Sequence, residues 1–493
     1  MLKNNKLKPK IKSKKKVKSK KKVKSNNKIN SDNKINSNNK INSNNKIKKS
    51  VNENKKDAEN KDDTENTADA ENTEDSENTD DAENIKNVKK NTKSIKNPTE
   101  WIYLDNINSS IMNHKAEQIY KKNIQTKYTQ VEKNKIIDES KKYILHVCNS
   151  PDKKYEVYFT SGEIESNTIL LCSAINAYKK IRKIKPHIII SASEHDSIIT
   201  YANSLFDSGQ IDLSVIKPNS YGCILSELVL AAVKPNTCIV SITYINGELG
   251  SVNNIEKISS ILHDKKIPLH CDCSHIFGKH ALDLSKTTID ASTITFDKIN
   301  GPIGIGALII SNNLLNGYKL YDHSTTLSGK RLQNIPAISS AIESLKSSLN
   351  NRKNKNKKIL KFRNDIINKL GEKCQTMTFA NFMKSDKPPL DENKNSSNKL
   401  IILGPPTNNE SYYTPTILSM MLISDKKKTG DDIKNELEKK GIIIGVPDTN
   451  KNFMYKEIGI PDSALIYIIR ISISDDIKQE NINKFIDAIK SII

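Results

Sequence analysis

From about Trp101, the chain alternates strand-length runs rich in isoleucine and valine with stretches long enough for helices. The strand-length runs are YEVYFTSG, HIIISAS, TCIVSITYI, PLHCDCS, ASTITFD and GALIIS. Stretches such as SNTILLCSAINAYKKIRK and NIEKISSILHDKK lie between them. Strands that alternate with helices build a sheet whose strands run largely parallel. The sequence therefore predicts an α/β fold.

The chain has 493 residues, which is room for two or three domains. We expect a large α/β domain with a mixed or parallel sheet over residues 98–345 and a smaller C-terminal α+β domain over 346–493. A charged helical stretch over 341–370 could link the two domains, and a polar insertion lies near 384–398. The last segment, ISDDIKQENINKFIDAIKSII, has the apolar spacing of an amphipathic terminal helix.

Residues 1–97 are of low complexity, first basic (KSKKKVKSKKKVKS) and then acidic (DAENKDDTENTADAENTEDSENTDDAEN). They carry too little apolar surface to offset the entropy of folding, so we predict a disordered tail. In a chain with a net charge of +22, the lysine block could contact nucleic acid or an anionic surface. A solvated tail without a partner, or pairing of the two blocks with each other, are the alternatives.

The cysteines predict the cellular compartment. Seven of them are scattered without the paired spacing of a secreted scaffold, which indicates reduced thiols. No apolar run reaches the roughly 18 residues that a membrane span needs, and the N-terminus has no apolar core of a secretory signal. We therefore expect a cytoplasmic protein without a membrane segment.

Lys298 and Asp272 each lie at the end of a predicted strand. The carboxyl ends of such strands are where α/β proteins build their sites. A pyridoxal phosphate enzyme needs this pair, because the lysine forms a Schiff base with the cofactor aldehyde and the aspartate keeps the pyridine nitrogen protonated. Taken alone, the two residues also fit a surface lysine at a turn and a surface or helix-capping acid.

The same region suggests a metal site, with His270, Cys271, Cys273 and His275 close together in the sequence. In a strand, however, successive side chains point to opposite faces. His270 and Asp272 then share one face, and the two cysteines share the other. Because the soft ligands do not converge, we expect no zinc or other metal site.

Several segments resemble class V aminotransferases of the cysteine desulfurase (NifS/IscS-like) type. WIYLDNINSS is similar to YLDNAATT, YFTSGEIESN to FTSGATESN, and SASEHDSII to TSxxEHxAV. VSITYINGELGSVNNIEKIS is similar to VSxxxxNNEIGxxQxIxEI, PLHCDCSHIFGKHALDLS to HxDAxQxxGKxxxDL, and ITFDKINGPIGIGALII to FSGHKxYGPKGIGALYI. Near the end, IGIPDSALIYIIRISIS resembles the segment that carries an xxRxS arginine. The segments keep their order over about residues 101–490.

The resemblance implies the fold type I architecture of pyridoxal phosphate-dependent transferases, with a large domain, a small C-terminal domain and a homodimer. At the matching positions, Lys298 would be the Schiff-base lysine and Asp272 the partner of the ring nitrogen. His195 would stack on the ring and could relay protons. Taken alone, His195 also fits a surface or capping histidine.

The resemblance also places three further residues in the site. His275 stands where the family has a glutamine that bonds the ring hydroxyl, and an imidazole can hydrogen-bond there as well. Thr295 stands where a serine hydroxyl contacts the phosphate. Arg470 would bind the substrate carboxylate, although an arginine in a strand can also pair with a protein acid.

The sequence departs from the family pattern around the phosphate. The threonine of SGATES is Ile164, preceded by Glu163 in place of alanine, and the histidine before the lysine is Asp297. The asparagine before Glu248 is Gly247, and the RSGT phosphate loop aligns with residues 329–332, GKRL. A phosphate near a like charge is strongly repelled, and a positive charge from Lys330 or Arg331 in the last segment would offset this repulsion.

The region that carries the catalytic cysteine in desulfurases is GIIIGVPDTNKNFMYKEIG here, and it contains no cysteine. No cysteine follows Cys374 in the chain. A thiolate is the group that accepts the sulfur. If sulfur transfer operates, the thiol must come from another place or another chain.

The resemblance implies a diverged, cysteine desulfurase-like enzyme that takes sulfur from L-cysteine, leaves alanine and hands a persulfide to a sulfur acceptor protein. Two alternatives stay open. A different pyridoxal phosphate reaction, by an aminotransferase or a β-lyase, needs no protein thiol. A non-catalytic pseudoenzyme with the same fold is favoured by the substitutions at Glu163, Ile164 and Asp297.

Overall fold

The computed structural model describes residues 101–317, 333–384, 398–405, 412–448 and 453–493. They all lie within one compact unit, Asn87–Ile493. The predicted tail over 1–97, the GKRL segment and nearly all of the polar insertion fall outside the described residues.

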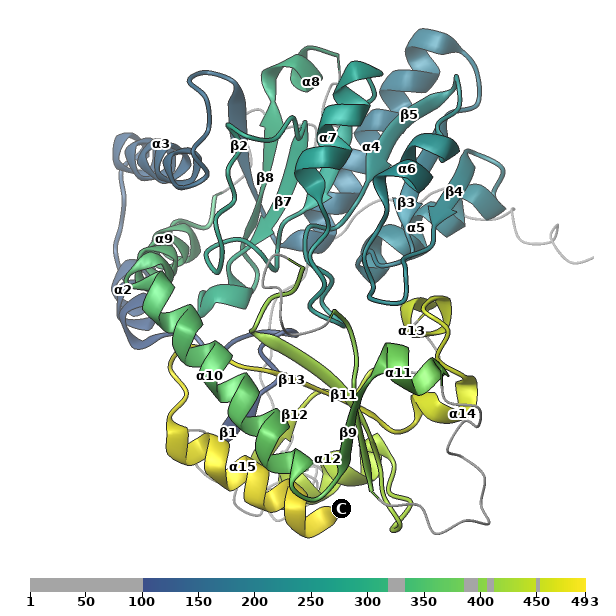
Figure 1. Ribbon diagram of the computed structural model, residues 1–493. Helices are drawn as coiled ribbons and strands as arrows, with labels where there is room; N and C mark the ends of the chain where they lie inside the picture. Colours follow the sequence, from purple (N-terminus) through teal and green to yellow (C-terminus); the bar gives the residue numbers. More distant parts are fainter. Residues whose placement is uncertain (1–100, 318–332, 385–397, 406–411, 449–452) are drawn as a thin grey trace, which may run out of the picture. The chain divides into compact units, whose positions relative to one another are not determined.

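A seven-stranded sheet forms the larger part of the described chain (Figure 1). Its strands, in spatial order, are β2 (Tyr155–Thr160), β8 (Gly306–Ser311), β7 (Ala291–Thr295), β6 (Leu269–Asp272), β5 (Thr237–Ser241), β3 (His187–Ser191) and β4 (Asp212–Ile216). β8 is antiparallel to β2 and β7, and the other pairs are parallel. The predicted α/β fold with a mostly parallel sheet is confirmed.

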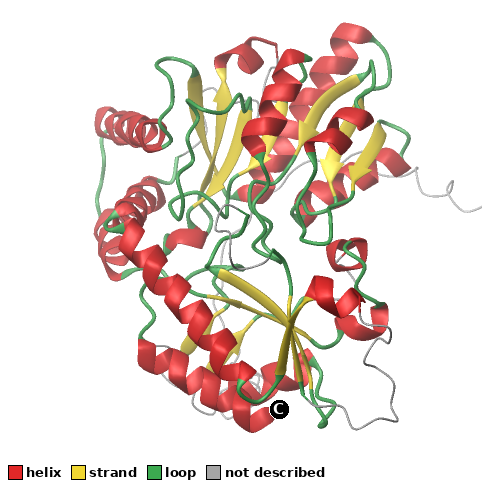
Figure 2. Ribbon diagram, viewed as in Figure 1, coloured by secondary structure: helices red, strands yellow, loops and turns green. Residues whose placement is uncertain are grey.

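Helices cover both faces of this sheet (Figure 2). Alternate residues of β3 show the consequence, because Ile189 belongs to one apolar cluster and Ile188 and Ile190 to another. The first cluster includes side chains of α3 (Gln130–Val147) and α7 (Ile255–Asp264), and the second includes those of α4 (Glu163–Arg182) and α5 (Asp196–Asp207). Burial on both faces explains why the strands are continuous apolar runs.

Two smaller sheets form the C-terminal part. One contains β13 (Ile468–Ser472), β11 (Ile417–Ile423), β10 (Lys399–Ile402) and β9 (Gln375–Thr378), and the other pairs β1 (Ile102–Leu104) with β12 (Ile442–Ile444). The predicted terminal helix is confirmed as α15 (Gln479–Ile492), which runs beside α10 in Figure 1. The pairing of β1 brings residues assigned to the large domain into a sheet of the C-terminal part.

The helical stretch over 341–370 is two helices rather than one. α9 (Ile335–Leu349) ends at Asn350, and α10 (Arg352–Gly371) begins after Asn351. Asn351 has a φ of 56°, a left-handed conformation that asparagine adopts more readily than most residues. α9 packs in the core of the seven-stranded sheet and α10 in the core of the C-terminal part, so the break lets one segment serve both.

The remaining helices are shorter or lie at the edges of the sheets. They are α2 (His114–Ile124), α6 (Ser226–Ala232), α8 (Asn312–Gly317), α11 (Phe379–Lys384), α12 (Gly430–Lys439), α13 (Phe453–Glu457), α14 (Asp462–Leu465) and the 3₁₀ turn η2 (Asp297–Ile299). Within the described ranges, no helix combines the length and the apolar character that crossing a bilayer requires.

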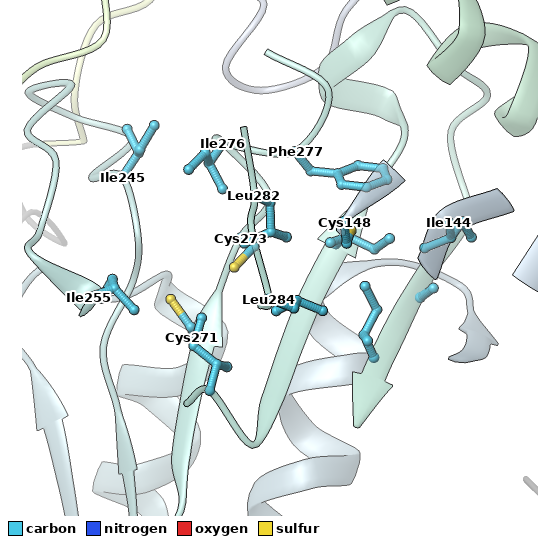
Figure 3. Packing of buried hydrophobic residues seen from close by; sticks show 14 of the residues in the cluster. Ile144, Cys148, Ile245, Ile255, Cys271, Cys273, Ile276, Phe277, Leu282 and Leu284 are labelled. Carbon is cyan, nitrogen blue, oxygen red and sulfur yellow. The ribbon is translucent and has the colours of Figure 1, made fainter. Parts of the chain in front are cut away.

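The cysteines of β6 and the turn after it lie in the apolar core. Figure 3 shows Cys271 and Cys273 among Ile255, Ile276 and neighbouring aliphatic side chains. His270 points to the other face, where its imidazole nitrogens lie 2.9 Å from Ser241 Oγ and 3.0 Å from Thr293 Oγ1. The predicted assignment of faces is confirmed. Among the described residues, no three His, Cys, Asp or Glu side chains are grouped as metal ligands.

Candidate active site

A cavity of about 430 Å³ lies at the carboxyl ends of β3, β5, β6 and β7. Five of the six predicted site residues line it: Lys298, Asp272, His195, His275 and Arg470. The four from the seven-stranded sheet follow the ends of parallel strands, which meet at one edge of a sheet. Arg470 reaches the cavity from β13 of the C-terminal part.

Lys298 lies in the 3₁₀ turn directly after β7 and is only 7% exposed. Its Nζ donates a hydrogen bond to the carbonyl of Asn108 at 2.6 Å. Two carboxylates are close as well: Asp297 Oδ2 at 3.2 Å and Glu163 Oε1 at 3.8 Å. The turn needs Gly301, because a Cβ there would lie 2.6 Å from the carbonyl oxygen of Phe296.

Asp272 ends β6 and is buried. Its carboxylate accepts hydrogen bonds from Asn167 Nδ2 at 3.1 Å and from the backbone N–H of Ser274 at 3.0 Å. Burial raises the pKa of Asp272, and the negative charge of Glu163 raises it further. In the part of the chain that the structure describes, no lysine or arginine forms an ion pair with it.

His195 is the N-cap residue of α5, and its Nδ1 lies 2.8 Å from Ser197 Oγ, which can accept a hydrogen bond from it. Its Nε2 lies 3.0 Å from Glu163 Oε1. Burial acts to lower the pKa of His195, but the hydrogen bond and charge of Glu163 raise it to about 9, so the ring is protonated at neutral pH. Although burial acts to raise the pKa of Glu163, His195 and Lys298 lower it.

His275 faces Gly247 across the cavity. A Cβ at Gly247 would lie 2.6 Å from His275 Nε2, so only glycine leaves room for the imidazole. Burial lowers the pKa of His275 well below its usual value, and the ring is therefore neutral. Its Nδ1 is buried without a hydrogen-bond partner among the described residues. Gly247 and His275 both depart from the family pattern, and the missing side chain of the first leaves space for the second.

Arg470 is buried and pairs with acids. Its Nη1 contacts Glu248 Oε1, and its Nη2 lies 3.7 Å from Asp105 Oδ1. Tyr455 donates from its hydroxyl to Glu248 Oε2 at 3.1 Å. The Nε of Arg470 is buried with no partner in the described ranges. The two terminal nitrogens of the guanidinium therefore contact protein acids, whereas Nε does not.

Thr295 does not line the cavity. Its hydroxyl donates to the carboxylate of Asp297, which does not line the cavity either. Its expected contact with a phosphate is not formed by this arrangement and stays a prediction. None of the seven cysteines, all of which lie in the described ranges, lines the cavity either; the segment around 441–459 contributes Val446, Pro447, Asp448 and Met454.

Sequence reasoning missed two members of the site. Glu194 is fully buried, with Oε1 accepting from the Thr243 N–H at 2.7 Å and the Ser191 hydroxyl at 2.6 Å. Burial raises the pKa of Glu194 to about 7. Its signal was an acid shortly after the buried strand β3. Tyr455 gave no such signal, because only the fold brings it to Glu248.

Residues 104–347 match the sequence model of the family described as aminotransferase class-V. These residues, just under half of the chain, are thus similar to the class V aminotransferase family. The class V region and its neighbours resemble the putative cysteine desulfurase NifS of Bacillus subtilis, with 35% identity over 215 residues, 42% of this chain and 53% of the relative. Cysteine desulfurase IscS of Plasmodium falciparum is 33% identical over 185 residues, 38% of this chain and 33% of the relative.

The alignments to these two class V relatives thus span about half and a third of their lengths. A solved structure of a NifS-like protein from Rickettsia africae shares the fold over 80% of this chain and 99% of that chain, with a TM-score of 0.64 and 19% identity. The expected fold type I architecture, with a large mostly parallel sheet and a smaller C-terminal part, is therefore confirmed.

Members of the class V family use pyridoxal phosphate. The cavity fits the aldehyde and the ring of this group. A buried amine and a buried carboxylate, Lys298 and Asp272, line the same space. Three buried polar atoms around Asp272 have no partner among the described residues: Asn167 Oδ1, Ser274 Oγ and His275 Nδ1. Of these residues His275 lines the cavity, and a polar ring there would satisfy its Nδ1.

Proposed function

We propose that the protein is a pyridoxal phosphate-dependent, cysteine desulfurase-like enzyme. The observation that carries the proposal is the convergence of Lys298, Asp272, His195 and Arg470 on one cavity from four separate segments. The class V family match and the desulfurase relatives support it. The cofactor, when bound, supplies an aldehyde that bonds to amines and a ring that draws electrons from the substrate.

Each residue has a role that its position supports. Lys298 would hold the aldehyde through its amine, and the same amine, when free, would carry protons to and from the substrate. Asp272 would pair with the ring nitrogen. The cationic His195 would lie against the ring, and the neutral His275 would hydrogen-bond a ring oxygen. Thr295 would contact the phosphate after turning its hydroxyl from Asp297.

Arg470 supports the choice of an amino acid substrate. Its Nε has no partner among the described residues, and a carboxylate is the group that a guanidinium binds best. Glu248 occupies one face of the same guanidinium and keeps it in place. We propose L-cysteine as the substrate, because the named relatives are cysteine desulfurases.

The acceptor of the sulfur must come from outside the cavity. In the proposed reaction the C–S bond of cysteine breaks, the sulfur bonds to an acceptor thiolate, and the carbon takes a proton to give alanine. No cysteine of this chain lines the cavity. We therefore propose that a second protein or a small thiol accepts the sulfur as a persulfide.

Two further properties belong to the proposal. A homodimer is proposed from the resemblance to NifS/IscS-like proteins. A reducing, cytoplasmic compartment is proposed because the seven cysteines are free and five of them are buried. Contact of the basic tail with nucleic acid or an anionic surface also stays a proposal.

The test uses the full chain loaded with pyridoxal phosphate. L-cysteine and dithiothreitol are added, and alanine, pyruvate and sulfide are measured. We expect a visible absorbance band that borohydride removes, and the reduced cofactor should then be found attached to Lys298. Alanine should form together with sulfide. Lys298→Ala should fold, by circular dichroism, and show neither the band nor the product. A protein that takes up no cofactor would contradict the enzyme and support the pseudoenzyme.

One observation favours a different enzyme of the same class. Because the cavity contains no thiol from this chain, a β-lyase, which releases sulfide without a protein thiol, also fits. The same assay separates the two. Pyruvate and ammonia in place of alanine would identify the β-lyase, and a sulfur-containing keto acid would identify an aminotransferase.

A further inference from the structure

The charges at the Lys298 end of the cavity are unusual for a site that holds a phosphate ester. Glu163 lines the cavity with Oε1 3.8 Å from Lys298 Nζ, and Asp297 Oδ2 lies 3.2 Å from the same atom. Both side chains are largely buried, with exposed fractions of 13% and 16%. Within the described ranges, Lys298 and His195 are the positive groups that contact these acids, and Lys279 also acts on Asp297 and Lys298 from beyond ion-pair distance.

The covalent structure of the cofactor places its phosphate at this end. In pyridoxal compounds the aldehyde is para to the ring nitrogen, and the carbon that bears the phosphate is next to the aldehyde. With the ring nitrogen at Asp272 and the aldehyde at Lys298, the phosphate would therefore lie on the side of Lys298. It would share this end of the cavity with Glu163, which lines it, and lie near Asp297, whose carboxylate is next to the Lys298 amine.

The backbone offers only a partial compensation. α4 begins at Glu163 after Gly162 and has no side-chain cap, so its N-terminus attracts anions. A helix N-terminus is equivalent to about half a positive charge, which is less than the full negative charge of Glu163 in its first turn. Glu163 thus opposes a phosphate dianion more strongly than this helix N-terminus attracts it.

We propose that Glu163 and Asp297 are specificity determinants that reduce the preference of the site for the phosphate, so that it accepts unphosphorylated pyridoxal about as well as pyridoxal phosphate. The ligand class is then a pyridine aldehyde rather than its phosphate ester. The inference rests on the proposed function, because it requires an aldehyde bound at Lys298.

The two acids have unequal effects on a bound phosphate. Removing the charge of Asp297 leaves the His195–Glu163 pair intact. Removing the charge of Glu163 also lowers the pKa of His195, which Glu163 holds at about 9, so one positive charge is lost with the negative one. Asp297→Asn is therefore the stronger test, and Glu163→Gln should change the preference in the same direction but less.

The experiment titrates the cofactor-free full chain with pyridoxal and, separately, with pyridoxal phosphate, following visible absorbance and protein fluorescence. The measured quantity is the ratio of the two dissociation constants. For the unchanged protein we expect a ratio within about tenfold of one. Asp297→Asn should shift the ratio toward the phosphate ester by about tenfold or more, and leave pyridoxal binding nearly unchanged.

Glu248→Gln is the matched control, because its carboxylate lies in the same cavity but contacts Arg470 instead of Lys298. It should leave the ratio unchanged. An unchanged ratio in Asp297→Asn, with both aldehydes still bound, would overturn the inference and leave the proposed function standing. If neither aldehyde binds the unchanged protein or any variant, the proposed function itself fails, together with the inference.

Discussion

At one end of the cavity, Asp272 accepts hydrogen bonds from an amide and a backbone N–H, whereas at the other end Glu163 and Asp297 contact cations. Neutral donors orient a carboxylate without cancelling its charge, so Asp272 stays available to a ligand. At the Lys298 end the charges already compensate one another, and a ligand must replace existing ion pairs. At one end of the cavity the carboxylate is thus available to a ligand, whereas at the other end the charged side chains already form ion pairs with one another.

The C-terminal part repeats the second pattern. Arg470 is buried between Glu248 and Asp105 and holds both acids. A carboxylate that depends on a cation loses far more when the cation is removed than one that depends on neutral donors. Four predictions test this distinction, in order of expected size.

The largest effect is expected for Arg470→Ala. It leaves Glu248 and Asp105 buried without their cation, so the free energy of unfolding should fall by about 3–5 kcal/mol. Urea denaturation of the cofactor-free protein measures it. Arg470→Lys, which keeps a charge but not the guanidinium geometry, should recover part of the loss. A decrease below about 1 kcal/mol would show that the acids do not depend on Arg470.

Asp272→Asn should behave in the opposite way. Because burial raises the pKa of Asp272 above its ordinary value, its ionised form costs folding free energy, and the neutral amide should leave stability equal or higher. Cofactor affinity should fall by about 10- to 100-fold, the worth of one hydrogen bond to a charged group. Thermal unfolding and absorbance titration measure the two effects. A marked loss of unfolding free energy would contradict the distinction between Asp272 and the acids that depend on a cation.

Gly247→Ala tests how tightly the side chains pack between the two ends of the cavity. A Cβ there would lie 2.6 Å from His275 Nε2, so the imidazole must move in a packed site. We expect a loss of about 1–3 kcal/mol in unfolding free energy, as for other overpacked positions. The same substitution in a His275→Ala background should cost much less. Equal costs in both backgrounds would mean that the imidazole is not the obstacle.

The smallest effect is the pH dependence of the His195–Glu163 pair. The pKa of His195 is raised from 6.5 to about 9, so its contribution is fully present below pH 6.5 and is lost as the pH rises through 9. The difference in melting temperature between the unchanged protein and Glu163→Gln should therefore shrink between pH 6.5 and 9.

The matched control is Glu227→Gln, which removes an exposed ion pair with Lys257. Exposed pairs contribute little to stability, so its difference in melting temperature should stay near zero at every pH. A Glu163→Gln difference that is constant across the same range would show that His195 does not titrate with Glu163.

Much of the fold was predictable from local pattern. Continuous apolar runs such as HIIIS and ASTIT specify strands buried on both faces, and each became a strand of the seven-stranded sheet. Lys298 and Asp272 could be placed together because each ends such a strand. The break at Asn351 was less predictable, because helix-favouring residues flank it and only two adjacent asparagines mark it.

By itself, the sequence determined the α/β architecture, the ends of the strands and which residues of β6 face the core, since these depend on side-chain spacing over a few residues. Only the tertiary structure decided how the charges pair. Glu163 meets His195 and Lys298, and Glu248 meets an arginine 222 residues away. Such pairing depends on which loops the fold brings to one cavity, and no local pattern encodes that distance.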